Sequence, residues 1–134
     1  MALSLLRSYH LLIVSTNRAI AIGEHGKCAD LTQVPTPVIV LYEVYRWLRR
    51  ERGDEEALIA AAQIAKTQVV PVTVTLALTA ADLGLEHGLP MADSLVYATA
   101  MSTGAELITS DADFASLPGV IYLAKPKPGP PTPG

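Results

Sequence analysis

The chain has 134 residues, half of them hydrophobic, so it can fold as one domain with a substantial core. Its formal net charge of −3 gives no overall indication of nucleic-acid binding. The single cysteine, Cys28, excludes a disulfide framework and a cysteine-based zinc site, and it favours a reducing compartment such as the cytoplasm.

The two ends of the chain differ in what they can bury. The first 14 residues are rather apolar, but Arg7 and His10 interrupt them, so they are predicted to belong to the fold and not to a signal peptide. They are too few to cross a bilayer, and no membrane association is expected. Residues 125–134 read KPKPGPPTPG and have almost nothing to bury. We therefore expect a folded domain over 1–124 and a disordered tail over 125–134.

Apolar periodicity, helix caps and turn residues predict alternating strands and helices. Strands are expected at 10–14, 32–34, 68–73, 105–110 and 119–123, and helices at 18–29, 37–52, 54–66, 74–85 and 90–103. Helices between apolar strands predict parallel pairing through right-handed crossovers. The expected fold class is α/β, a three-layer α/β/α sandwich with a central, mostly parallel sheet. Ligands of such sheets bind beyond the carboxyl ends of the strands.

Helical spacing also predicts which side chains face the core. The inward residues are expected to include Leu58 and Ala62 in 54–66, Leu76 and Ala80 in 74–85, and Val96 and Ala100 in 90–103. The small residues Ala98, Ala100 and Ser102 would also allow another helix to approach closely, either within the domain or across a dimer interface.

Two aspartates are predicted to meet at one edge of the domain. Asp93 lies in the first turn of the helix that follows Pro90, and Asp111 follows the strand at 105–110. Because this helix runs back beside the strand, the start of the helix and the end of the strand share an edge. Each acid alone could be a helix-dipole partner or a turn residue. Together they would repel each other unless a cation lay between them, and hard oxygen ligands suit Mg²⁺ or Mn²⁺.

Glu43 is a candidate third acid. It lies in the second turn of the helix at 37–52, with Arg46 and Arg50 three and seven residues later on the same side. One interpretation is that these three residues form salt bridges within the helix. The other is that Glu43 faces the acidic edge while Arg46 and Arg50 contact the phosphate backbone of a nucleic acid.

These spacings resemble those of a PIN domain, and most closely the VapC-type toxins of toxin–antitoxin pairs. The resemblance covers about residues 10 to 124. It depends on the segments 35–53 (PTPVIVLYEVYRWLRRERG), 89–100 (LPMADSLVYATA), 108–114 (ITSDADF) and 117–123. It implies a parallel-sheet α/β/α fold, a homodimer, an antitoxin protein as partner, and cleavage of RNA with Mg²⁺ or Mn²⁺.

The resemblance also assigns roles to individual residues. It places Glu43, Asp93 and Asp111 at the family's second, third and fourth acids, and Asp113 at a further acid that many members have. It places Thr109 or Ser110 at the small hydroxyl residue that precedes the fourth acid.

The sequence departs from the family pattern at Ser15. The family's first acid ends the first strand, and the matching run here is Ile13-Val14-Ser15-Thr16-Asn17. A hydroxyl carries no charge and ligates Mg²⁺ weakly, so the expected function is a metal-dependent ribonuclease whose activity Ser15 impairs. The alternative is a catalytically silent domain that binds a protein or RNA. A phosphoryl-accepting receiver domain is disfavoured, since the first strand is not followed by an acid pair.

Overall fold

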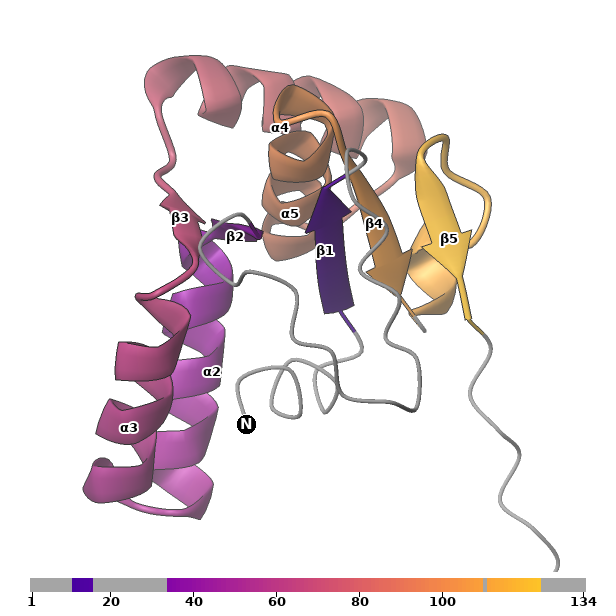
Figure 1. Ribbon diagram of the computed structural model, residues 1–134. Coiled ribbons are helices and arrows are strands. Elements are labelled where there is room, and N and C mark those ends of the chain that lie inside the picture. Colours follow the sequence, from indigo (N-terminus) through magenta and orange to yellow (C-terminus); the bar gives the residue numbers. More distant parts are fainter. Residues whose placement is uncertain (1–10, 16–33, 110, 124–134) are drawn as a thin grey trace, which may run out of the picture.

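A computed structural model describes residues 11–15, 34–109 and 111–123, with 11–15 described as backbone (Figure 1). The predicted helix at 18–29, the tail at 125–134 and Ser110 lie outside the described residues. Residues 32 and 33 of the strand predicted at 32–34 also lie outside the described residues. The strands are β1 (Leu11–Ser15), β2 (Pro35–Pro37), β3 (Gln68–Val70), β4 (Ala105–Thr109) and β5 (Val120–Tyr122). The helices are α2 (Val38–Glu51), α3 (Asp54–Ile64), α4 (Val74–His87), α5 (Met91–Ser102) and a short 3₁₀ helix, η2 (Ala112–Phe114).

The four predicted helices within these ranges are confirmed, with shifts of one or two residues at their ends. One start differs in its chemistry. Thr36 and Pro37 were expected to be the cap and first residue of a helix, but they belong to β2, and α2 begins at Val38 without a side-chain cap. The Thr36 hydroxyl donates to the backbone oxygen of Val34, the residue before β2, at 3.5 Å, so it does not cap the helix. In contrast, Thr73 caps α4 as a threonine does, accepting from the backbone N–H of Leu76 at 3.1 Å.

The strands form two small sheets, where one central sheet was expected. β1, β4 and β5 form one in that order, and β2 and β3 form the other. β2–β3 and β4–β5 are parallel pairs, as predicted. β1 pairs antiparallel to β4, with Ser15 opposite Ala105, and Figure 1 shows the two arrows running in opposite directions. The prediction that β1 is parallel is therefore wrong. The α/β fold class with short, mostly parallel strands is confirmed.

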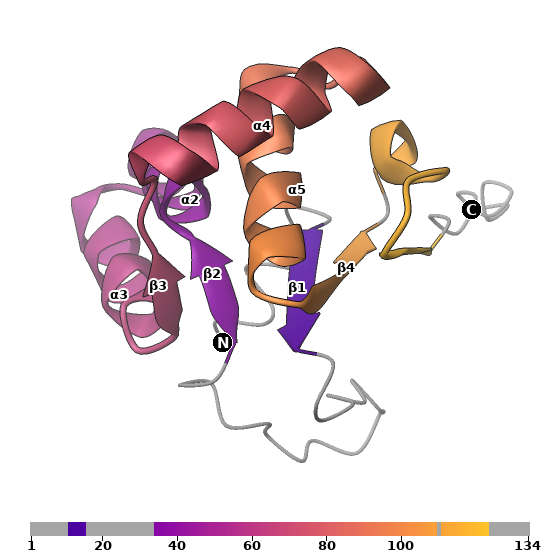
Figure 2. The ribbon, with the colours of Figure 1, turned by 90° about the horizontal axis from the view of Figure 1, so that it is seen from above.

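The helices are arranged around α5, which packs against strands β4 and β2 and carries α4 on its outer side (Figure 2). α2 and α3 pair as a hairpin that extends to one side of the domain. The main core is shared by α2, α3, α5 and the segment that follows β4. Its fully buried side chains include Val44, Ile64, Tyr97, Leu107 and Phe114.

The predicted inward residues were correct for two helices and wrong for one. Leu76, Ala80, Val96 and Ala100 are buried. On α3, by contrast, Leu58 is 59% exposed. The inward residues of α3 are instead Ala57, Ala60 and Ile64. α3 has small or apolar residues on nearly every side, so periodicity left its orientation undetermined.

Candidate metal centre

Asp93 is placed by the start of helix α5. The helix begins at Met91, directly after Pro90, and Asp93 lies in its first turn, half-buried. The end of α4 approaches this turn closely, since a Cβ on Gly84 would lie 3.2 Å from the Cβ of Ser94. This packing holds the first turn of α5 against α4.

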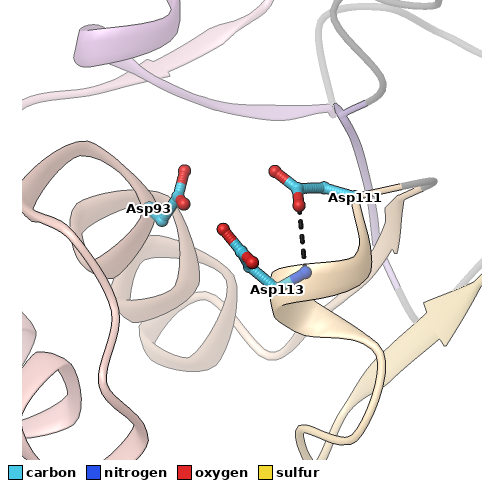
Figure 3. Close-up of side chains that lie close together, drawn as sticks. All are labelled: Asp93, Asp111 and Asp113. Atoms are coloured by element: carbon cyan, nitrogen blue, oxygen red, sulfur yellow. Dashed lines mark hydrogen bonds between the residues drawn. The ribbon is translucent and has the colours of Figure 1, made fainter.

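Asp111 and Asp113 are placed by the turn that follows strand β4. The backbone N–H of Asp111 donates to the Thr109 hydroxyl at 3.0 Å. The backbone N–H of Asp113 donates to Asp111 Oδ1 at 3.0 Å (Figure 3). Thr109 is 2% exposed, and Phe114 is fully buried. The turn is therefore fixed at both ends, by a buried hydroxyl at its start and a core aromatic ring at its end.

The structure brings Asp93, Asp111 and Asp113 together from two separate elements (Figure 3). One carboxylate oxygen from each lies within 4.8 Å of the other two. Burial raises the pKa of Asp93 to about 6, and the negative charges of Asp111, Asp113 and Glu43 add to the effect. Within 34–109 and 111–123, neither lysine nor arginine forms an ion pair with any of these three aspartates. Their mutual repulsion is thus not offset by a neighbouring cation of the described chain.

The donor set fits a small divalent ion. Octahedral Mg²⁺ with bonds of about 2.1 Å needs ligand oxygens separated by roughly 3 to 4 Å. One oxygen from each of the three carboxylates lies within 4.8 Å of the other two, which is close to this spacing. All three donors are hard carboxylate oxygens, which Mg²⁺ and Mn²⁺ prefer. Asp93 and Asp111 were expected to come within reach of one ion, and the geometry brings them together with Asp113.

Glu43 lies outside this group of three but acts on it. It is half-buried on α2, and burial raises its pKa. Its charge contributes to the raised pKa of Asp93, so the two carboxyls are near enough to interact electrostatically. Arg46 is exposed, and Arg50 Nε donates to Glu51 Oε1 at 2.8 Å. The acidic edge therefore includes Glu43, while Arg46 and Arg50 lie further along α2.

The expected position of Ser15 is corrected by the structure. Ser15 was expected at the acidic edge, where its family counterpart would be a metal ligand. Because β1 is antiparallel to β4, Ser15 pairs with Ala105 at the start of β4, while Asp111 follows the end of β4. The length of β4, roughly 13 Å at about 3.3 Å per residue, separates the two ends. A short apolar run such as HLLIV does not encode its direction, so the sequence left this pairing open.

Sequence reasoning also missed a buried residue that links α5 to the segment between η2 and β5. Tyr97 is 2% exposed on α5, and its hydroxyl donates to the backbone oxygen of Pro118 at 2.7 Å. A weak signal was present in the sequence, since a tyrosine four residues after Asp93 falls on the same face of the helix.

Comparison with known proteins places this geometry in a family. The family description "PIN domain" matches residues 15–120 of the chain. The fold is similar to a chain of a toxin–antitoxin complex from Klebsiella pneumoniae, with 26% sequence identity and a TM-score of 0.56. The similarity covers 63% of this chain and 69% of that chain. No curated protein matches the sequence.

A membrane span can be assessed for the same part of the chain. Within 34–109 and 111–123, none of the helices combines the length and the apolar character needed to cross a bilayer.

Proposed function

This chain belongs to the PIN domain family, and we propose that it is a divalent-metal-dependent ribonuclease of the toxin–antitoxin type. The observation that carries the proposal is the convergence of Asp93, Asp111 and Asp113 from α5 and the turn after β4. The K. pneumoniae relative, described as a toxin–antitoxin complex, supports the toxin class. RNA is the proposed substrate, and the cytoplasm is the proposed site of action.

Different residues of the chain have different roles in the proposed site. Asp93, Asp111 and Asp113 would hold Mg²⁺ or Mn²⁺, and Glu43 would add a fourth negative charge beside them. Thr109 holds the backbone of Asp111 in place. The chemistry that a divalent ion supplies at such a site is polarisation of a phosphate group and activation of water.

Arg46 and Arg50 are proposed to contact RNA. They lie on α2 on the same side as Glu43, and both are exposed. At a rise of 1.5 Å per residue, Arg46 lies about 4.5 Å and Arg50 about 10 Å beyond Glu43 along the helix. Two cations at these positions would bind successive phosphates of a strand whose scissile bond lies at the acidic edge.

The impairment expected from Ser15 is not part of the proposal. The antiparallel pairing of β1 puts Ser15 opposite Ala105 and away from Asp111. The site is therefore proposed to work with the four acids Glu43, Asp93, Asp111 and Asp113.

Mn²⁺ titration by calorimetry, beside cleavage of a fluorescent RNA, tests the proposal. Asp93→Asn and Asp111→Asn should each abolish both signals. Asp82→Asn, which alters an exposed aspartate on α4 outside the cluster, should change neither. Mn²⁺ binding without RNA cleavage in the unmodified chain would favour the catalytically silent binding domain. Absence of both would contradict the proposal.

Protein partners are proposed on two grounds. The structural relative is described as a toxin–antitoxin complex, and an antitoxin partner is proposed here by analogy. A homodimer is proposed through the outer side of α4, where Val74 (79% exposed), Leu78 (64%) and Leu85 (86%) repeat at helical spacing. Ala98 and Ala100 are fully buried within the domain, so they do not provide this surface.

Light scattering tests the dimer. The unmodified chain should have the mass of a dimer at high micromolar concentration, and Leu78→Glu should give a folded monomer. A monomeric unmodified chain under these conditions would refute this part of the proposal.

A further inference from the structure

The three aspartates of the acidic cluster come from two elements, α5 and the turn after β4. The chain connects these elements directly only at the end of α5 that lies away from Asp93. Asp93 begins α5, while Asp111 and Asp113 lie between β4 and β5. The chain passes from α5 to β4 through Thr103 and Gly104, at the end of α5 opposite Asp93. Non-covalent contacts must therefore fix the separation of the carboxylates.

Tyr97 makes such a contact. It lies four residues after Asp93, one helical turn along the same face of α5. Its hydroxyl donates to the backbone oxygen of Pro118, 21 residues away, at 2.7 Å. Pro118 belongs to the segment that returns from η2 to β5, and Asp113 lies within η2. One side chain thus links the helix of Asp93 to the segment of Asp111 and Asp113.

The ring of Tyr97 is itself held on its other side. The His87 ring, at the end of α4, meets it edge to face with 5.7 Å between centroids and 88° between planes. Tyr97 is 2% exposed and lies in the same core cluster as Phe114 and Leu117. Apolar packing holds the segment against the core, and the backbone N–H of Leu107 bonds to the Gly119 oxygen at 3.1 Å, which ties the segment to β4. The hydrogen bond from Tyr97 is a directional contact that ties the same segment to α5, the helix of Asp93.

The two acids after β4 would move together if this link were lost. The backbone N–H of Asp113 bonds to the Asp111 carboxylate, and the N–H of Leu117 bonds to the Phe114 oxygen at 3.1 Å. A shift at Pro118 therefore passes through this compact turn to both acids. Metal–ligand bonds in a well-formed site lie within about 0.2 Å of their preferred lengths, so a displaced acid has to move back to bind the ion, and binding weakens.

We propose that Tyr97 is a positioning residue for the metal centre, setting the distance from Asp93 to Asp111 and Asp113 through its hydrogen bond to Pro118. This inference rests on the proposed function, since it concerns the same metal ion. Tyr97 does not touch the ion. It acts through the segment that carries two of the three ligands.

Tyr97→Phe tests the inference, because it keeps the ring and removes only the hydroxyl. Calorimetric Mn²⁺ titration of the folded chain at 10 °C should show about tenfold weaker binding, as is typical when a group that orients ligands is lost. RNA cleavage should then require more Mn²⁺ and recover to the unmodified rate at saturating Mn²⁺. Thr67→Val is the matched control. It removes a buried hydroxyl that donates to the Ile64 oxygen at 2.6 Å on another part of the fold, and Mn²⁺ affinity should not change.

Gly119→Ala is a second variant that leaves Tyr97 intact. Gly119 has φ +76°, a left-handed backbone conformation that alanine adopts only with strain, so the substitution strains the turn beside Pro118 even if the flexible end of Met101 moves away from the new Cβ. Mn²⁺ binding should weaken here too.

The outcomes separate the two claims. Unchanged Mn²⁺ affinity in folded Tyr97→Phe would overturn the inference and leave the proposed function intact. If that variant does not fold, unchanged affinity in folded Gly119→Ala would overturn it. An unmodified chain that binds no Mn²⁺ would contradict the proposed function, and the inference with it.

Discussion

Asp93→Asn should stabilise the metal-free chain at neutral pH while it abolishes metal binding. The pKa of Asp93 rises from 3.8 to about 6 in the folded state, because burial and the negative charges of Asp111, Asp113 and Glu43 disfavour its ionised form. A carboxyl whose pKa is raised by folding costs stability wherever it must ionise. Asparagine has a similar shape and no charge, so it removes that cost.

The pH dependence of this effect has a definite sign. Below about pH 3 Asp93 is protonated in both the folded and unfolded chain, and its full contribution to stability is present. Between about pH 3 and pH 7 the unfolded chain releases the proton first, so stability falls as pH rises. Above about pH 7 Asp93 is ionised in both states and the cost is constant. The difference in stability between the variant and the unmodified chain should therefore vanish near pH 3 and be largest above about pH 7.

The magnitude follows from the size of the pKa change. A rise of about two units corresponds to about 3 kcal/mol at 1.36 kcal/mol per unit. Asp93 is only half-buried, and solvent screens its interactions, so about 1.5 kcal/mol is a better expectation. For a domain of this size that is a rise of about 5 °C in melting temperature.

Thermal unfolding by circular dichroism, in chelator and at several pH values, measures this directly. Added Mn²⁺ at 100 times its dissociation constant should stabilise the unmodified chain by about 2.7 kcal/mol and leave Asp93→Asn unchanged. Asp82→Asn is the control and should show neither effect. A variant less stable than the unmodified chain at pH 7.5, or a difference that does not shrink steadily as the pH is lowered from 7 toward 3, would refute the reasoning.

Three further substitutions test other parts of the site. Thr109→Val removes the acceptor for the Asp111 N–H and should weaken Mn²⁺ binding at least tenfold by calorimetry, whereas Thr109→Ser keeps the hydroxyl and should not. If Thr109→Val binds Mn²⁺ as tightly as the unmodified chain, Thr109 has no part in the site. Arg46→Gln should weaken RNA binding and reduce its salt dependence by about one phosphate contact, whereas the control Arg49→Gln should change neither. RNA affinity measured over a series of salt concentrations for both variants tests this, and equal effects of the two would contradict the role of Arg46. Ser15→Asp should leave Mn²⁺ affinity unchanged, and a gain would contradict the placement of Ser15 opposite Ala105, away from the acids.

The sequence was most informative where chemistry and periodicity agreed. Pro90, the apolar face of α5 and the turn after β4 together predicted that Asp93 and Asp111 share an edge. The structure brings them together with Asp113. The α/β class followed from the same alternation of helices and apolar strands.

Tertiary packing decided what the sequence could not. A five-residue apolar run does not determine the direction of a strand in the sheet. The prediction that β1 is parallel, with Ser15 at the acidic edge, was therefore wrong. α3 is apolar on nearly every side, and its contact with α2 selected Ala57, Ala60 and Ile64 as the inward face. The role of Tyr97 depends on a contact across 21 residues, which local patterns do not reveal.

A crystal of the chain soaked in Mn²⁺ and recorded at the manganese absorption edge tests the central claim most directly. We expect an anomalous peak between Asp93, Asp111 and Asp113, about 2.1 to 2.3 Å from one oxygen of at least two of them, and its loss in Asp111→Asn crystals. A fully soaked crystal with ordered carboxylates and no peak at this site would contradict the assignment of a metal centre.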